Sequence, residues 1–259
     1  MSRLPKALPL ALALAALIVF AAFTASCGSS SAQARFVNAI SNTPGPFDID
    51  FNGIKEFSSV GFGQASASTY VGVPSGTDTI EALAAGTTTE EFSSTTSLNS
   101  GADYTLVATG RLNGSIAPNI MPFVDNNTAP TNGSVNFRVI NASFYGPSGS
   151  GGAVDVYILA NPNPVIPSSC SAAGVNCIAD LAYNATKPYV TLPYNSAGSG
   201  WQLIVTVTGS TTPYFNDPLP NVGSSAEGSI CTLVLTDQAN GTVMSSTFVP
   251  LNDLNCSGQ

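Results

Sequence analysis

Phe47-Asp48-Ile49-Asp50-Phe51-Asn52-Gly53 alternates apolar with acidic residues and ends in an Asn-Gly pair. A period of two is that of a β-strand, so we expect the apolar side chains on one face and Asp48 and Asp50 on the solvent face. An Asn-Gly pair tolerates positive φ at both positions and favours the tight turn of a β-hairpin. The same pair stands between apolar runs at residues 113–114 and 240–241. These features predict an all-β fold.

The chain contains this kind of unit twice. Five segments return in the same order: Arg35-Phe36-Val37-Asn38-Ala39 as Arg138-Val139-Ile140-Asn141-Ala142, Phe47-Asp48-Ile49-Asp50-Phe51 as Val154-Asp155-Val156-Tyr157-Ile158, Tyr70-Val71-Gly72-Val73-Pro74 as Tyr189-Val190-Thr191-Leu192-Pro193, Thr105-Leu106-Val107-Ala108-Thr109 as Thr232-Leu233-Val234-Leu235-Thr236, and Met121-Pro122-Phe123 as Val249-Pro250-Leu251. The offset between the copies grows from 103 residues at the first segment to 128 at the last. Insertions in the second copy would produce this growth, so the order indicates an internal duplication.

The duplication divides the chain into two domains, residues 35–126 and 135–259, joined by a polar linker at 127–134. About seven short strands per hundred residues favour a two-sheet β-sandwich of the immunoglobulin-like or transthyretin-like kind. A small barrel fits the same pattern. Because the linker is polar and each copy has its own apolar strands, we expect the two domains to fold separately.

Residues 1–26 have the features of an export signal. Arg3 and Lys6 precede an apolar run at residues 8–23, which is short for a bilayer core about 30 Å thick. The sequence Thr24-Ala25-Ser26-Cys27 resembles the cleavage site of bacterial lipoproteins, whose peptidase cuts just before a cysteine that carries diacylglycerol. An ordinary secretory signal cut near Ala25 or Ala34 is the alternative.

The lipoprotein resemblance implies a lipid anchor on Cys27 and a flexible tether at residues 27–34. Gly28 follows the cysteine, where an aspartate would retain a Gram-negative lipoprotein at the inner membrane, so the resemblance implies the outer membrane. Acyl chains on Cys27 would anchor the protein without a membrane-spanning helix.

Composition excludes several classes of function. The 259 residues include no histidine and carry a formal net charge of −8. An acidic chain cannot neutralise a run of phosphates, so nucleic acid is not an expected partner. Without histidine the chain lacks the commonest general base and the commonest metal ligand. We therefore expect no enzymatic activity and no cofactor.

The cysteines indicate disulfides in the second copy. Once Cys27 is assigned to the lipid, the chain keeps Cys170, Cys177, Cys231 and Cys256. An even count in an exported protein favours disulfides, and three connectivities are possible. The short spacing of Cys170 and Cys177 makes them the natural first pair, which leaves Cys231 with Cys256. The spacings do not match a four-thiolate zinc site.

Four motifs of the first copy resemble the bacterial domain of unknown function 4397. They are Ala34-Arg35-Phe36-Val37-Asn38-Ala39, Asp48-Ile49-Asp50-Phe51-Asn52-Gly53, Tyr70-Val71-Gly72-Val73-Pro74-Ser75-Gly76 and Tyr104-Thr105-Leu106-Val107-Ala108-Thr109-Gly110. The second copy departs from the pattern at Leu159-Ala160-Asn161-Pro162, which replaces the Asn-Gly turn, and at Cys231, which replaces Tyr104. The resemblance implies exported or lipid-anchored tandem β domains and assigns no catalytic residue.

Two groups of residues are candidates for binding. Asp48, Asp50 and Asn52 match the opening of a helical calcium loop, but Ser59 occupies the position where that loop needs a glutamate. The tyrosines that could form an exposed row for a sugar are Tyr183, Tyr189 and Tyr194.

The sequence thus favours a non-catalytic binding, adhesion or structural module of the cell envelope, with an unknown envelope or extracellular protein or a glycan as partner. A carbohydrate-binding module is the alternative and would need an exposed aromatic row. A hydrolase that uses only Asp and Glu is a third hypothesis and would need two facing carboxylates in a cleft.

Overall fold

The computed structural model describes residues 31–254 and 256, except for residues 44, 67–68, 115, 145–151, 161–163, 173–174, 195–200, 219–226 and 238–246. Residues 31–259 form one compact unit. Every regular element in the described residues is a β-strand, and no helix among those residues is long and apolar enough to span a membrane. The predicted all-β fold is therefore confirmed.

Each repeat is built from the same sequence of strands. The strands of the first repeat are β1 (Ser31–Asn38), β2 (Phe47–Phe51), β3 (Ile54–Val60), β4 (Gln64–Ala65), β5 (Val71–Pro74), β6 (Gly76–Ala84), β7 (Glu90–Leu98), β8 (Asp103–Thr109) and β9 (Asn119–Val124). Those of the second are β10 (Ser134–Asn141), β11 (Val154–Ala160), β12 (Cys177–Leu181), β13 (Ala185–Thr186), β14 (Val190–Pro193), β15 (Trp201–Val207), β16 (Pro213–Pro218), β17 (Ile230–Thr236) and β18 (Thr247–Leu254).

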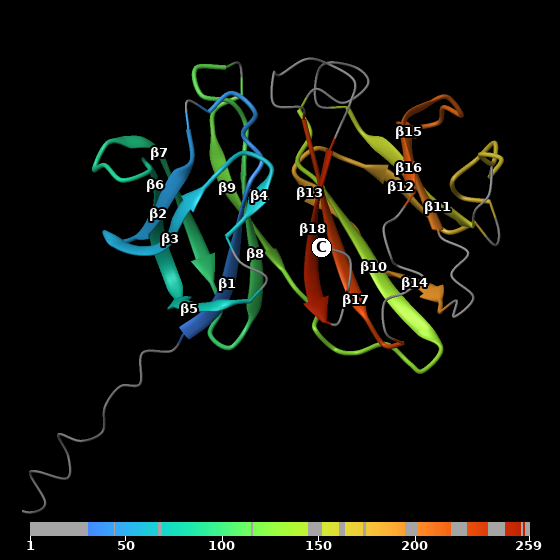
Figure 1. Ribbon diagram of the computed structural model, residues 1–259, viewed down its shortest axis with the longest axis horizontal. Coiled ribbons are helices and arrows are strands. Elements are labelled where there is room, and N and C mark those ends of the chain that lie inside the picture. The colour runs from blue at the N-terminus through green and yellow to red at the C-terminus, as the bar shows by residue number, and fades with distance from the viewer. Residues whose placement is uncertain are drawn as a thin grey trace, which may run out of the picture. The chain divides into compact units, whose positions relative to one another are not determined.

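The strand pairing repeats as well, which supports the internal duplication. In the first repeat one sheet has the order β4-β1-β8-β9, with β5 also paired to β1, and the other has the order β3-β2-β6-β7 (Figure 1). The second repeat has the corresponding orders β13-β10-β17-β18, with β14 on β10, and β12-β11-β15-β16. Strands β1 and β8 run parallel, as do β10 and β17.

Each repeat is a sandwich, because its two sheets enclose one apolar core. In the first repeat, Phe36 of β1 and Leu106 of β8 belong to the same buried cluster as Ile49 of β2. The second repeat has a matching cluster that includes Val139 of β10 and Val156 of β11. Two packed sheets per repeat confirm the predicted sandwich architecture.

The hairpin predicted at Asn52-Gly53 is present and joins β2 to β3. Asn52 has φ of 49° and Gly53 has φ of 81°, so both residues adopt the left-handed conformation that a type I′ turn requires. Asn113 also has a positive φ, 57°, in the turn between β8 and β9. The pair Asn240-Gly241 lies outside the described residues.

A third apolar cluster joins the two repeats. It takes Val37 and Val107 from the first repeat and Ile140 and Val234 from the second, all fully buried. These side chains lie on the faces of β1, β8, β10 and β17 that point away from each repeat's own core. Each repeat therefore has its own core, but the sheet β4-β1-β8-β9 is covered on both faces by this third cluster, which was not predicted from the sequence.

The sheet β3-β2-β6-β7 of the first repeat and the sheet β12-β11-β15-β16 of the second, which we call the outer sheets, differ at one set of matching positions. In the first repeat Asp50 pairs with Lys55 on one side and Glu81 on the other. The second repeat has Tyr157 between Cys177 and Ile204 at these positions. A charged row on the first outer sheet is thus replaced by an apolar row on the second.

The insertion between β11 and β12 covers this apolar row. Ile166 and Val175 of the inserted loop pack against the buried Tyr157 and Ile204. The structure contains the predicted Cys170–Cys177 disulfide, with a Cα–Cα distance of 5.4 Å, at the end of the loop. The departure from an Asn-Gly hairpin in the second repeat therefore accompanies a small additional core.

Candidate functional site

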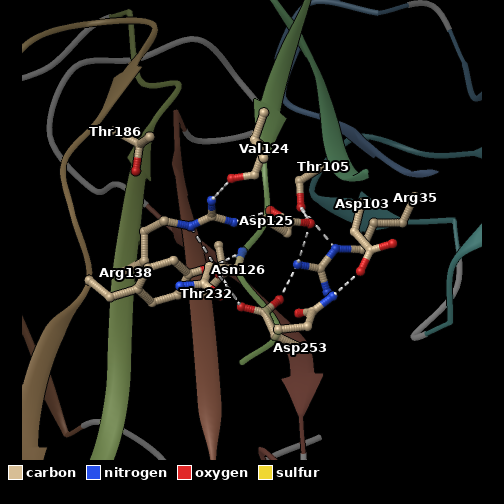
Figure 2. Close-up of polar contacts among 12 residues, drawn as sticks. Arg35, Asp103, Thr105, Val124, Asp125, Asn126, Arg138, Thr186, Thr232 and Asp253 are labelled. Atoms are coloured by element: carbon tan, nitrogen blue, oxygen red, sulfur yellow. Dashed lines mark hydrogen bonds and ion pairs between the residues drawn. The ribbon is translucent and has the colours of Figure 1, made fainter. Parts of the chain in front are cut away.

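Four charged side chains meet between the two repeats. Arg35 of β1 and Arg138 of β10 occupy equivalent positions, and Asp125, just after β9, corresponds to Asp253 near the end of β18. All four side chains are at most 2% exposed. Figure 2 shows that they converge on one small volume between the strands of both repeats. We call these four residues the buried charge cluster.

Asp125 connects the cluster to both repeats. Its Oδ2 accepts hydrogen bonds from the hydroxyls of Thr105 at 2.7 Å and Tyr70 at 2.6 Å, and lies 3.4 Å from the guanidinium of Arg35. Its Oδ1 accepts from the guanidinium of Arg138 in the second repeat. One carboxylate thus binds the arginine of each repeat.

Asp253 makes the reciprocal contact from the second repeat. Its carboxylate accepts hydrogen bonds from the guanidinium of Arg35 and from the hydroxyl of Thr232. The hydroxyl of Tyr189 lies 3.5 Å away. The cluster and its hydrogen-bonded neighbours therefore have an approximate twofold relation, in which each repeat supplies an arginine and an aspartate to the cluster and a threonine and a tyrosine beside it.

The parallel strand pairs fix the arginines in place. Arg35 is in register with Thr105 across β1 and β8, and its Nε donates to the Thr105 hydroxyl at 2.9 Å. Arg138 is in register with Thr232, and its Nε donates to that hydroxyl at 3.2 Å. Arg138 also donates from Nη1 to the carbonyl oxygen of Val124 at 2.8 Å.

A tyrosine ring covers each guanidinium. The centre of the Tyr70 ring is 4.9 Å from Cζ of Arg35, and the centre of the Tyr189 ring is 4.9 Å from Cζ of Arg138. A cation over an aromatic face is stabilised, and more so when water is excluded.

Protonation in the cluster follows from burial and charge. Burial alone would lower the pKa of Arg35, but the carboxylates of Asp253 and Asp125 outweigh it and raise that pKa above its usual value. Burial, followed by the charge of Asp125, raises the pKa of the Tyr70 hydroxyl far above its usual range. Burial also raises the pKa of Asp253, against the attraction of Arg35. Arg35 stays charged and Tyr70 stays protonated at neutral pH, so neither supplies a base or a nucleophile.

The cluster can hold strands together, but its carboxylates have few hydrogen-bonding positions left for a substrate. Both oxygens of Asp125 accept hydrogen bonds or ion pairs from its own chain, as do both oxygens of Asp253. Buried charges are tolerated in proteins when they are paired and hydrogen-bonded in this way. The cluster therefore connects the two repeats through buried ion pairs and hydrogen bonds.

The recurring asparagine of each repeat is also structural. The side-chain amide of Asn38 donates to the carbonyl oxygen of Val60 at 3.1 Å, and that of Asn141 donates to Leu181 at 3.1 Å. Each asparagine thus connects the two sheets of its own sandwich. The Arg-x-x-Asn motif near the start of each repeat is explained by two structural roles. The arginine forms ion pairs between the repeats, and the asparagine connects the two sheets of its own sandwich.

Asp125 and Asp253 were not predicted from the sequence as partners of the two arginines. The signal was present, because Asp125 stands two residues after Phe123 and Asp253 stands two residues after Leu251. Phe123 and Leu251 end the last segment shared by the repeats. Extending that segment by two residues in each copy would have matched the two aspartates.

The three predicted ligand-facing tyrosines have partners within the chain. The Tyr183 hydroxyl accepts from the backbone N–H of Gly110 at 2.9 Å, and its ring packs edge-on against Phe144. Tyr189 covers Arg138, and Tyr194 packs against the second core. A role of these tyrosines in binding a ligand stays a prediction.

Asp48 is buried, contrary to the predicted solvent-exposed position. Asp48 is 3% exposed and Asp50 is 9% exposed. The Asp48 carboxylate accepts the backbone N–H of Ser59 at 2.8 Å and of Gly86 at 2.9 Å, and pairs with Lys55. The alternation correctly placed these residues on the face opposite the core. However, neighbouring backbone and side chains cover that face, so it is not open to solvent.

Asp155 repeats the arrangement in the second repeat. It accepts the N–H of Asp180 at 2.8 Å and of Gly209 at 2.9 Å. Ser59 and Asp180, which donate to the two aspartates, have φ of 55° and 49°. Both carboxylates thus hold segments of irregular backbone in place through hydrogen bonds. This structural role explains the presence of Asp48 without a bound ion. Among the described residues no group of three or more His, Cys, Asp or Glu side chains is arranged to hold a metal ion.

Replacement of Asp48 by asparagine is expected to lower the free energy of unfolding by about 1–3 kcal/mol, because an amide cannot accept both N–H groups and the Lys55 contact. Burial would raise the pKa of Asp48, but the hydrogen bonds from Lys55, Gly86 and Ser59 together lower it below the ordinary value of 3.8. The stability it contributes is therefore present above that value and is lost as the pH falls through the lowered pKa.

Urea unfolding of the native chain and of Asp48→Asn between pH 2 and pH 7 tests this expectation. The difference between them should shrink in acid, while Glu90→Gln at an exposed position should match the native chain throughout. A difference that is constant with pH would show that the carboxylate charge is not involved.

A protein-family model matches part of the chain. The sequence model of a family described as a domain of unknown function (DUF4397) matches residues 32–157. This stretch contains nearly all of the first repeat and continues through β10 into β11. A comparison with curated proteins finds no match.

Two solved structures show weak similarity. The Bacillus anthracis TIE protein matches with a TM-score of 0.23 and 10% sequence identity, over 81% of this chain and 34% of that one. This chain therefore spans about a third of the length of that protein. A Bacteroides fragilis protein described as a candidate for cell adhesion matches with a TM-score of 0.20 and 12% identity, over 80% of this chain and 72% of that one. Similarity at this level carries no argument about fold or function.

Proposed function

We propose from the fold and the charge cluster that the chain is a non-catalytic module of the cell envelope. The DUF4397 family, whose model matches residues 32–157, has no known function. The chain would bind or support a partner through the outer surface of its two joined sandwiches. The partner would be an envelope or extracellular protein, or a glycan.

The observation that carries this proposal is the use of the repeated polar residues. The arginines, asparagines and aspartates that recur in the two repeats all make contacts within the chain. A catalytic site needs at least one polar group with a free position toward a substrate. The features that define the repeat support a rigid scaffold instead.

The electrostatic character of the surface supports an extracytoplasmic role and argues against anionic partners. After removal of residues 1–26 the chain would keep Arg35, Lys55, Arg111, Arg138 and Lys187 as its basic residues. Two of these five, Arg35 and Arg138, are buried in the cluster. Only Lys55, Arg111 and Lys187 then remain as basic residues outside the cluster, too few for a basic patch that could attract nucleic acid or anionic lipid.

We further propose that a lipid on Cys27 attaches the module to the outer membrane. The support is the signal-like sequence before Cys27 and the glycine that follows it. The expected tether at residues 27–34 is too long by four residues, because Ser31 already begins β1 and Ala32 and Ala34 belong to the first core. Residues 27–30 would then connect the lipid to β1.

The experiment that tests the proposal compares the native chain with Cys27→Ser in a Gram-negative host. The native chain is expected in the outer-membrane fraction with a mass increased by diacylglycerol. Cys27→Ser is expected as an uncleaved precursor or a soluble protein, because no thioether can form. Ser29→Ala, two residues away, serves as the control and should behave as the native chain.

A second experiment, with the purified native chain, tests the absence of catalysis. Isolated envelopes incubated with the purified native chain should retain the bound protein and release no soluble sugar or peptide fragments. Membrane attachment and mass that are unchanged in Cys27→Ser would contradict the anchor. Fragment release that disappears when a carboxylate is replaced would contradict a non-catalytic module.

A further inference from the structure

We infer that the Cys231–Cys256 disulfide stabilises the contact between the two repeats and that its reduction weakens this contact. Cys231 lies on β17 and Cys256 follows the end of β18, and their Cα atoms are 5.4 Å apart. Three residues before Cys256, Asp253 makes its ion pair with Arg35 of the first repeat. The disulfide therefore constrains the segment that carries one of the residues joining the repeats.

A β-bulge makes Asp253 dependent on this constraint. On β17, Ile230 pairs with Leu254 and the next residue, Cys231, pairs with Asn252. Asp253 is thus an extra residue on β18 with no partner in the ladder. A bulge redirects a side chain and locally interrupts the hydrogen bonding of the strand. Strand β18 is also at the edge of its sheet and has β17 as its only paired neighbour there.

The first repeat has no bulge at the corresponding place. Tyr104 pairs with Val124, and the N–H of Asp125 donates to the carbonyl oxygen of Asp103 at 2.8 Å. The ladder itself therefore holds Asp125 in position. Tyr104 occupies the position of Cys231, and its side chain is buried in the first core. The disulfide thus stands in the repeat where the regular ladder is interrupted.

Loss of the disulfide would affect the first repeat through Asp253. Freed from Cys231, the end of β18 would be held by its pairing with β17 and by the contacts of Asp253 with Arg35 and Thr232. The end of an edge strand is the part of a sheet that frays most easily. Movement of Asp253 would leave the buried guanidinium of Arg35 with Asp125 as its remaining carboxylate. A buried charge that loses a partner strongly disfavours the docked arrangement.

The chemistry requires a dithiol reductant. One thiolate of the reductant attacks the Cys256 sulfur, which belongs to the more exposed cysteine of the pair, and the Cys231 sulfur leaves and takes up a proton. The second thiol of the reductant, as its thiolate, then attacks the mixed disulfide and releases Cys256 as a thiol. Two electrons and two protons pass from the dithiol to the protein, and the reductant becomes a disulfide.

Two backbone amides report the docking of the repeats directly. The N–H of Asn126 donates to the Tyr189 hydroxyl at 3.4 Å, and the N–H of Gly110 donates to the Tyr183 hydroxyl at 2.9 Å. Each amide belongs to the first repeat or the residues just after it, and each acceptor belongs to the second. Their hydrogen exchange can be followed by NMR before and after the chain is treated with dithiothreitol.

On reduction of the native chain we expect exchange at both amides to accelerate by about tenfold or more, because the docked state becomes less populated. Cys231→Ala/Cys256→Ala should show the fast exchange without reductant. Cys170→Ala/Cys177→Ala is the matched control, since that disulfide closes a loop on the far sheet of the second repeat. It should leave both amides slow until reductant is added.

The Asp253→Asn variant distinguishes an effect of the disulfide that acts through Asp253 from a general loss of stability. If the disulfide acts through Asp253, reduction of this variant should accelerate exchange at Asn126 and Gly110 by less than in the native chain. The inference would be overturned if both amides kept their slow exchange while amides of residues 247–254 alone became fast. It would also be overturned if reduction had the same effect with and without Asp253.

Discussion

Replacement of Asp125 by alanine is expected to lower the free energy of unfolding by about 3–5 kcal/mol, the range found when one partner of a buried ion pair is removed. Asp125 is the only residue of the cluster that contacts both arginines. Its loss would also leave the hydroxyls of Tyr70 and Thr105 without their carboxylate acceptor. Urea unfolding at neutral pH measures the effect.

The control for Asp125→Ala is Glu90→Ala, which removes an exposed acidic side chain at the start of β7. It should change the free energy of unfolding by less than about 0.5 kcal/mol. Because the cluster is buried, added salt should not reproduce the effect of the Asp125 change. A loss below about 1 kcal/mol, typical of surface ion pairs, would contradict the role assigned to the cluster.

Replacement of Val107 by aspartate is expected to separate the two repeats. Val107 is fully buried in the apolar cluster that the repeats share. An unpaired carboxylate there would have no compensating partner, so the docked arrangement should lose about 3–5 kcal/mol. The cores of the two sandwiches do not contain Val107, so each repeat should keep its strands.

Circular dichroism and thermal unfolding together test this expectation. Val107→Asp should retain the β-type spectrum but unfold at a lower temperature and over a broader range, since the repeats no longer support each other. Val165→Asp is the control, because Val165 is 88% exposed. An effect of Val107→Asp no larger than that of Val165→Asp would show that the shared cluster contributes little.

The local structure of each repeat could be predicted from the sequence. The alternation at residues 47–51 and the Asn52-Gly53 pair predicted β2, the turn and β3, because strand period and turn chemistry act over a few residues. The repeated segments gave the correct correspondence of strands. The spacing of the cysteines predicted both disulfide pairs that the structure contains.

The contact between the repeats was not predicted, because the alternation at residues 47–51 suggested strands with one buried and one exposed face. In Leu233-Val234-Leu235 the middle residue is apolar as well, and the whole of β17 is buried. A continuous apolar run is typical of a strand covered on both faces. Val107 lies in an equivalent run on β8, so the sequence carried the signal for a second buried face.

The charge cluster could not be predicted from residue type alone. Arg35 and Arg138 are two of few basic residues, and such residues are usually exposed. Their burial depends on Asp125 and Asp253, which are 90 and 218 residues from Arg35 in sequence. Only the three-dimensional arrangement brings these groups together, although the duplication contained the matching pairs.

Differential scanning calorimetry of the disulfide-intact native chain tests the central claim, that a shared apolar cluster and a buried charge cluster join the two repeats into one unit. One transition is predicted, with a calorimetric enthalpy equal to the van't Hoff enthalpy. Two separate transitions in the native chain, whose positions are unchanged by Asp125→Ala or Val107→Asp, would contradict it.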